Sequence, residues 1–259
     1  MLIIDIHTHN LLWKQPFKKM EETIRLAKKF GINKLCLLGD VLRFGYNPSP
    51  EQIKKINDLT VKLVRRWPEF LIGFCFLNPR HNKKFIFDEI EHCIIKEKFK
   101  GIKLEISVNA RDKRLDPIMK KAEELNIVVL HHSWDTSIIG RKIKSGGYQS
   151  DPSDIAELSC RFPNVKIIMA HLSGGGIKGI LKIKPLPNVW VDTSGSQPFS
   201  EIIEYAVKEL GPERILYGSD IPGRDFSSQL GRIYGAKIKE KEKRLILGEN
   251  AKKLLGLKC

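Results

Sequence analysis

Short apolar runs, rich in β-branched residues, alternate along the whole chain with longer segments in which apolar residues recur every three or four positions. The short runs predict β-strands and the longer segments predict amphipathic helices. One helical stripe comprises Met20, Ile24, Ala27 and Phe30, and a second comprises Ile53, Ile56, Leu59 and Leu63. The predicted strands are Leu2–His7, Lys34–Leu38, Leu71–Phe76, Gly101–Ile106, Ile127–His132, Val165–Ala170, Val189–Asp192 and Arg214–Gly218.

Eight alternations without a long polar linker predict an α/β protein with a parallel sheet. Its 259 residues suit a single (β/α)8 barrel, or TIM barrel, which takes about 250 residues. We therefore expect one domain over residues 1–259. An open doubly wound sheet would show the same alternation, so the position of the polar residues must separate the two folds.

Histidine and aspartate residues gather where the predicted strands end. His7 and His9 end or follow the first strand, His132 ends the fifth, His171 follows the sixth and Asp220 follows the eighth. Active sites of barrels lie at the C-terminal ends of the strands. Closure of a barrel places the eighth strand beside the first, so Asp220 and the two N-terminal histidines can share one ion. This arrangement favours the closed barrel over the open sheet.

The first strand carries a His-x-His pair. Because side chains alternate between the faces of a strand, His7 and His9 should point the same way, with Ile4 and Ile6 turned toward the helices. A hydrogen-bonded polar pair is the alternative, but the other polar strand ends favour a metal. Three imidazoles and a carboxylate, with one position left for water, are typical of catalytic zinc, which ionises that water near pH 7. We expect one divalent metal ion, with zinc as the default; nickel, manganese and iron accept the same ligands.

Composition restricts the setting and the partners. The five cysteines are scattered without a C-x-x-C pair, which predicts no thiolate metal site and indicates a reducing cytoplasm. No signal peptide is expected, and no apolar run reaches the roughly 20 residues that cross a bilayer. The net charge of +15 is spread over helical segments together with glutamate, so a solvated surface is favoured over a nucleic-acid interface. The expected partner is a small molecule, and a homo-oligomer remains open.

Several motifs together resemble one known family. IDIHTH, IVVLHHSWD, IIMAHLSGG, ILYGSDIP and LILGENAKKLLGL occur in that order, and GIKLEISVNARDKRLDPIM precedes the fifth strand. They resemble the amidohydrolase-related family that includes aminocarboxymuconate-semialdehyde decarboxylase, over nearly the whole chain. The resemblance implies a (β/α)8 barrel with a metal bound by the first-strand pair, a fifth-strand histidine and an eighth-strand aspartate. It also implies that a sixth-strand histidine acts as an acid or base.

Carried onto this chain, the resemblance makes His7, His9, His132 and Asp220 the metal ligands. His171 becomes the catalytic acid or base, and Asp220 also accepts the proton of the attacking water. The apolar pattern of the fifth strand cannot choose between His131 and His132. The family histidine is followed by x-Trp-Asp, which matches the segment after His132.

Four further residues are candidates for the site. Ile102, Leu104 and Ile106 share one face, which sends Lys103 inward. In some amidohydrolases a fourth-strand lysine is carboxylated and bridges two metals; here we expect Lys103 to be a charge partner beside a single metal. The candidate substrate-binding residues are Arg43, Trp134 and Arg224, because each follows a predicted strand and offers a guanidinium for a carboxylate or an indole for a planar ring.

The expected activity is hydrolysis of a C–N or C–O bond of a small organic substrate by metal-activated water, and an anionic substrate would suit the positive net charge. The alternative is non-oxidative decarboxylation of a small unsaturated or aromatic acid, which the same ligands allow. The turn after His132 resembles that of the decarboxylase, with Ser133 in place of proline. TatD-like nucleases and PHP-type phosphoesterases also open with Asp-x-His-x-His. They are disfavoured because Gly218-Ser219-Asp220 stands where TatD-like proteins usually have Glu-Thr-Asp.

Overall fold

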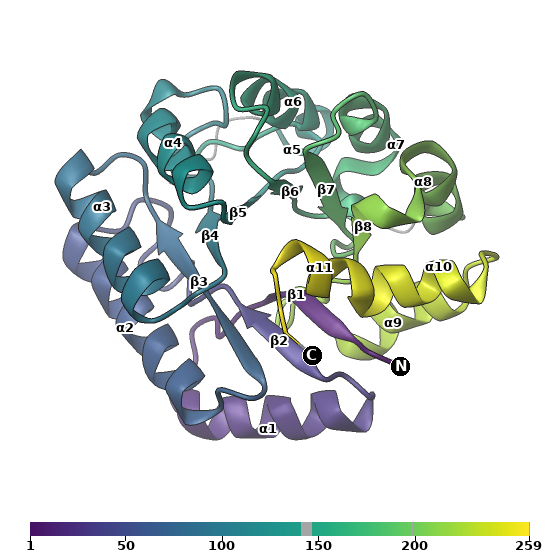
Figure 1. Ribbon diagram of the computed structural model, residues 1–259, viewed down its shortest axis with the longest axis horizontal. Helices are drawn as coiled ribbons and strands as arrows, with labels where there is room; N and C mark the ends of the chain where they lie inside the picture. Colours follow the sequence, from purple (N-terminus) through teal and green to yellow (C-terminus); the bar gives the residue numbers. More distant parts are fainter. Residues whose placement is uncertain (141–146, 198, 259) are drawn as a thin grey trace.

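A barrel of eight parallel strands, in the order of the chain, forms the centre of the molecule (Figure 1). The computed structural model describes residues 1–140, 147–197 and 199–258. The strands are β1 (Ile4–Thr8), β2 (Lys34–Leu37), β3 (Leu71–Leu77), β4 (Gly101–Leu104), β5 (Val128–His131), β6 (Ile167–Met169), β7 (Val189–Asp192) and β8 (Ile215–Leu216). All eight predicted strands are present, and several end earlier than predicted because their last residues belong to the loops.

Backbone hydrogen bonds join the segment directly after β8 to β1. The Ile6 amide donates to the Tyr217 carbonyl at 2.9 Å, and the Asp220 amide donates to the His7 carbonyl at 2.7 Å. A parallel bridge pairs Thr8 with Ile221. The sheet therefore nearly closes on itself, which confirms the predicted (β/α)8 barrel and excludes the open doubly wound sheet.

Helices surround the strands as an outer ring (Figure 1). Two helices begin where the sequence has a capping residue followed by proline. Ser49 caps the helix that begins at Pro50, and Asp151 caps the helix that begins at Pro152, both in capping boxes. No helix in the described parts of the chain combines the length and apolar character needed to cross a membrane. The helices are α1 (Pro16–Lys29), α2 (Pro50–Arg66), α3 (Lys83–Ile90), α4 (Asp116–Glu124), α5 (Thr136–Ile139), α6 (Pro152–Arg161), α7 (Leu172–Ile183), α8 (Ile202–Leu210), α9 (Phe226–Tyr234), α10 (Glu240–Arg244) and α11 (Asn250–Leu254).

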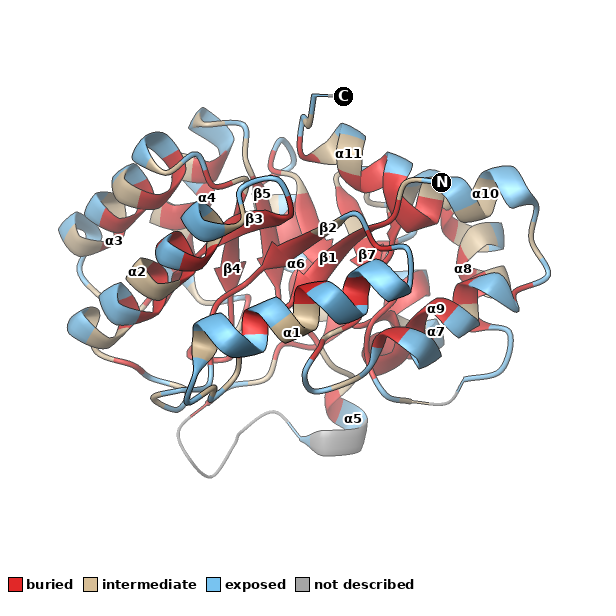
Figure 2. Cartoon of the chain, turned by 90° about the horizontal axis from the view of Figure 1, so that it is seen from below, coloured by how far each residue is buried: buried red, intermediate tan, exposed pale blue. Residues whose placement is uncertain are grey.

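The strand residues divide into an outer and an inner apolar cluster. The outer cluster joins alternate strand residues to the buried helix faces, including Met20 and Ile24 of α1. The inner cluster holds the other strand residues together with Ala251 and Leu255 at the end of the chain. Helix α11 thus closes one end of the barrel, and α5 lies at the opposite end (Figure 2). The buried positions, red in Figure 2, are concentrated in the strands and the inward helix faces.

The prediction for Ile4 and Ile6 was wrong. Both residues lie in the inner cluster and not in the outer cluster that packs against the surrounding ring of helices. The register between β1 and β2 shifts between Asp5 and Thr8, so three steps along β1 pass two steps along β2. An irregularity of this kind interrupts the simple alternation of faces and changes the direction of the side chains that follow it.

Candidate active site

His7 and His9 are held by hydrogen bonds at their Nδ1 atoms. Nδ1 of His7 lies 2.9 Å from Oδ2 of Asp192, and Nδ1 of His9 lies 2.9 Å from the Gly39 carbonyl oxygen. A carbonyl oxygen can only accept, so His9 carries its proton on Nδ1; a carboxylate imposes the same tautomer on His7. The Nε2 atom of each neutral ring is left with a lone pair.

These two lone pairs point to one place. The Nε2 atoms of His7 and His9 are 3.1 Å apart, and Oδ1 of Asp220 lies 3.7 Å and 3.9 Å from them. Burial lowers the pKa of His7 well below its usual value and that of His9 to about 4, so both rings are neutral at pH 7. Two nitrogens that share an ion at about 2.0–2.1 Å lie about 2.9–3.4 Å apart. The donor set therefore fits a divalent cation.

Asp220 follows β8 and comes next to β1 because its amide donates to the His7 carbonyl. Its backbone has φ of 59°, in the left-handed region that aspartate adopts more readily than most residues. Burial raises the pKa of Asp220 to about 7. The next helix, α9, begins at Phe226 and is capped by Asp225, so Asp220 is not used as a helix cap.

His132 and the adjacent His131 are directed to different surroundings. His132 lines the same cavity as His7 and His9, whereas His131 is fully buried and its Nδ1 lies 2.7 Å from the His132 carbonyl. Among the residues that the structure describes, those whose ligand atoms lie within 4.8 Å of one another include His7, His9 and Asp220 but not His132. The structure thus brings three of the four predicted ligands together and places the fourth in the wall of their cavity.

His171 stands at the start of α7 with φ of 68°, and its side chain contacts other site residues. Its Nδ1 lies 2.7 Å from Oγ of Ser194, and its Nε2 lies 3.3 Å from Nδ1 of His132. The ring centroid is 4.8 Å from that of His7. Burial lowers the pKa of His171 well below its usual value, so the ring is a neutral base at pH 7.

A cavity of about 270 Å³ joins these groups to two of the predicted substrate-binding residues, Trp134 and Arg224. The Trp134 ring centroid lies 5.5 Å from that of His171. The third candidate, Arg43, lines a separate hollow, and its Nη1 lies 3.1 Å from Oδ2 of Asp40. The structure therefore does not bring Arg43 to the histidines. The remaining wall is mainly apolar, with Leu11, Val41, Leu42, Tyr46 and Ile106.

Lys103 and Glu105 form an ion pair inside the barrel. Nζ of Lys103 lies 2.7 Å from Oε1 of Glu105, and Lys103 is completely buried. Burial alone would raise the pKa of Glu105, but Lys103 and His132 outweigh it and lower that pKa to about 2. The charge partner expected for Lys103 is therefore Glu105, which itself lines the cavity.

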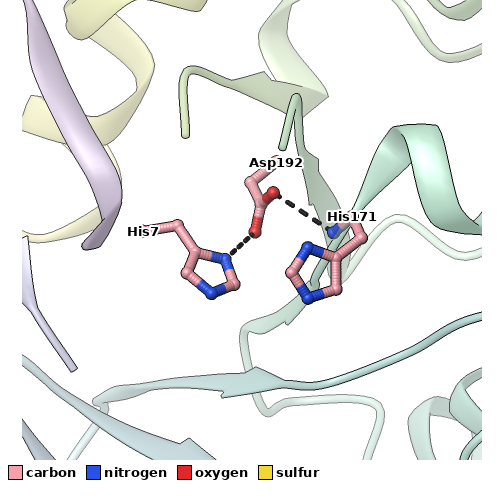
Figure 3. Close-up of side chains that lie close together, drawn as sticks. All are labelled: His7, His171 and Asp192. Atoms are coloured by element: carbon pink, nitrogen blue, oxygen red, sulfur yellow. Dashed lines mark hydrogen bonds and ion pairs between the residues drawn. The ribbon is translucent and has the colours of Figure 1, made fainter. Parts of the chain in front are cut away.

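Sequence reasoning missed Asp192 and Ser194. Asp192 ends β7 and is fully buried between His7 and His171 (Figure 3). Ser194 follows two residues later and bonds to both Asp192 and His171. The available signal was an aspartate at the end of a predicted strand, flanked in the barrel by strands that carry site residues. Only the strand order shows that β7 lies between β6 and β8.

The family follows from the sequence match. The model of the amidohydrolase family matches residues 4–257, so the chain belongs to that family. No curated protein matches the chain in sequence.

Solved structures share the barrel at low identity. 2,6-Dihydroxybenzoate decarboxylase from Rhizobium has a TM-score of 0.74 at 16% identity, covering 99% of this chain and 98% of that one. Dihydroxybenzoic acid decarboxylase from Polaromonas, with bound manganese and an inhibitor, has a TM-score of 0.72 at 17% identity, covering 99% and 96%. 4-Oxalomesaconate hydratase from Rhodopseudomonas palustris has a TM-score of 0.70 at 17% identity, covering 98% and 95%.

Proposed function

We propose that this protein is a metal-dependent enzyme that decarboxylates a small unsaturated or aromatic carboxylic acid without an oxidant. The observation that carries the proposal is a single small cavity that joins the His7, His9 and Asp220 group to the Arg224 guanidinium and the Trp134 indole. A guanidinium suits a carboxylate, and an indole suits a planar ring. The two dihydroxybenzoate decarboxylases with a similar barrel support testing this chemistry first.

His7, His9 and Asp220 would hold the metal, with His132 as the fourth ligand. Zinc is the default, and manganese is the second choice because the Polaromonas structure contains it. When bound, the ion would supply Lewis-acid polarisation of a substrate oxygen. The donor set supports this assignment because two neutral imidazoles direct lone pairs at one place beside a carboxylate.

The protein side chains would position the acid and move one proton. Trp134 would stack on the planar body of the substrate, and Arg224 would bind a carboxylate, while the apolar wall limits access of water. In decarboxylation the C–C bond breaks, its electron pair stays on the ring carbon and that carbon takes one proton. His171 is proposed to take this proton from solvent at Nε2 and deliver it to the carbon, because its Nδ1 is engaged by Ser194.

Hydrolysis of a C–N or C–O bond is the second candidate. The observation that favours it is the position of Asp220, whose Oδ1 lies 3.7 Å from Nε2 of His7 and 3.9 Å from Nε2 of His9, where a carboxylate can accept the proton of an attacking water. The same five residues would serve both reactions, so the substrate has to decide between them.

An activity screen with metal-loaded protein separates the two reactions. One panel contains hydroxylated benzoates and unsaturated acids, with carbon dioxide as the readout. The other contains esters, lactones and amides. Release of carbon dioxide that is lost on chelation and in His7→Ala supports the first proposal. Metal-dependent hydrolysis without carbon dioxide would replace it with the second, and no metal-dependent turnover in either panel would overturn both.

A further inference from the structure

We propose that Asp192 and Ser194 act as one positioning pair that sets the ring protons of both His7 and His171. In this arrangement each imidazole carries its proton on Nδ1 and presents an unprotonated Nε2. Any role of this pair in turnover rests on the proposed function, in which His7 binds the metal and His171 moves a proton. The assignment of the two tautomers does not rest on it.

Asp192 is an acceptor for four donors. Its Oδ2 accepts from Nδ1 of His7 at 2.9 Å. Its Oδ1 accepts from the amides of Ser194 at 3.0 Å and of His171 at 3.2 Å, and from the Ser194 hydroxyl. Figure 3 shows the carboxylate between the His7 ring and the His171 backbone. Because Asp192 is fully buried, its lone pairs depend on these protein donors.

The single hydroxyl proton of Ser194 determines the tautomer of His171. That proton is donated to Asp192, so Oγ can only accept from Nδ1 of His171, which lies 2.7 Å away. His171 must then carry its own proton on Nδ1, and its Nε2 is left as a base. The hydroxyl transmits to His171 the constraint that the carboxylate imposes directly on His7.

The two oxygens of Asp192 serve different histidines, so their effects can be separated. The Oδ2 arm reaches His7 alone, and the Oδ1 arm reaches the ring of His171 through Ser194. An imidazole with its proton on Nε2 cannot ligate an ion through that atom, and partners that orient a ligating histidine are typically worth about 10–100-fold in metal affinity. Loss of the Oδ2 arm should therefore weaken metal binding, whereas loss of the Oδ1 arm should spare it.

The test measures tautomers in the metal-free protein by 15N NMR of the histidine rings, and metal affinity by chelator competition. His7 and His171 signals are assigned from H7Q and H171Q. In Ser194→Ala we expect His171 to lose its exclusive Nδ1–H tautomer while metal affinity stays within about threefold of wild type. Ser194→Thr, which keeps the hydroxyl, should restore the His171 tautomer. Ser159→Ala removes another buried hydroxyl, bonded to Asn188 at 2.8 Å, and should change neither readout.

Asp192→Asn should change His7 as well. The asparagine oxygen can replace Oδ1 for the backbone amides, which leaves its NH2 group facing Nδ1 of His7. His7 should then move its proton to Nε2, and metal affinity should fall about 10–100-fold. If Asp192→Asn does not fold, the Ser194 variants still test the hydroxyl arm.

An unchanged His171 tautomer in Ser194→Ala, or failure of Ser194→Thr to restore it, would overturn the pair. Wild-type metal affinity in folded Asp192→Asn would overturn the His7 arm. Neither readout uses a substrate, so a negative activity screen would refute the proposed reaction and leave the pair standing on its own data.

Discussion

Replacement of His171 by alanine tests whether this histidine handles protons or holds the ion. The variant removes a buried imidazole ring, together with the hydrogen bond between its Nδ1 and Oγ of Ser194. Ser194 keeps its hydrogen bond to Asp192 and loses only the one it accepts from His171, which costs about 0.5–1.5 kcal/mol of unfolding free energy. His7, His9 and Asp220 keep their ligand atoms, so we expect the metal content to be retained. Turnover should fall about 10²–10⁴-fold, or about 3–5 kcal/mol of barrier.

His7→Ala is the comparison. It removes a nitrogen that lies 3.1 Å from Nε2 of His9, so both metal and turnover should be lost. The assay is elemental analysis after dialysis, followed by turnover at matched metal content and a thermal melt of each variant. The reasoning would be refuted if His171→Ala emptied the site as fully as His7→Ala does. His7, His171 and Asp192 are also close enough to hold an ion, and that result would move the ligand set toward them.

Three further predictions concern stability and stoichiometry. Burial raises the pKa of Asp5 to about 7, above its value in the unfolded chain, so the contribution of Asp5 to stability is present below about pH 4 and lost as the pH rises to 7. In denaturant titrations of the metal-free protein, Asp5→Asn should therefore match wild type at pH 4 and exceed its unfolding free energy by up to about 4 kcal/mol at pH 8. A Cβ on Gly218 would lie 3.0 Å from Cβ of His7, so Gly218→Ala should lower the unfolding free energy by about 1–3 kcal/mol and weaken metal binding. A thermal melt and a metal affinity equal to those of wild type would contradict this close contact. Carboxylation of Lys103 would place an anion against the carboxylate of Glu105. We therefore expect mass spectrometry to find Lys103 unmodified and elemental analysis to find about one metal per chain. Two metals per chain together with a modified Lys103 would refute the ion pair.

The candidate site was predictable from the sequence where its residues follow strand ends. His7, His9, His132, His171 and Asp220 all line one cavity, as expected from the rule that the C-terminal ends of barrel strands meet. Arg43 follows a strand by the same rule, yet it lies elsewhere. The direction of its long side chain depends on the loop after β2 and on the nearby carboxylate of Asp40, which no strand pattern encodes.

The sequence by itself determined the order of the elements and the barrel, because hydrophobic periodicity is local and eight repeats leave few ways to bury the apolar faces. Only the tertiary structure decided the rest. The register shift in β1 places Ile4 and Ile6 inside the barrel, since it depends on pairing with β2. The tautomer of His7 depends on Asp192, which is 185 residues away in the chain and meets it only when the barrel closes. Contacts of this kind depend on packing and hydrogen bonding between strands that are distant in the sequence, so the local spacing of residue types does not predict them.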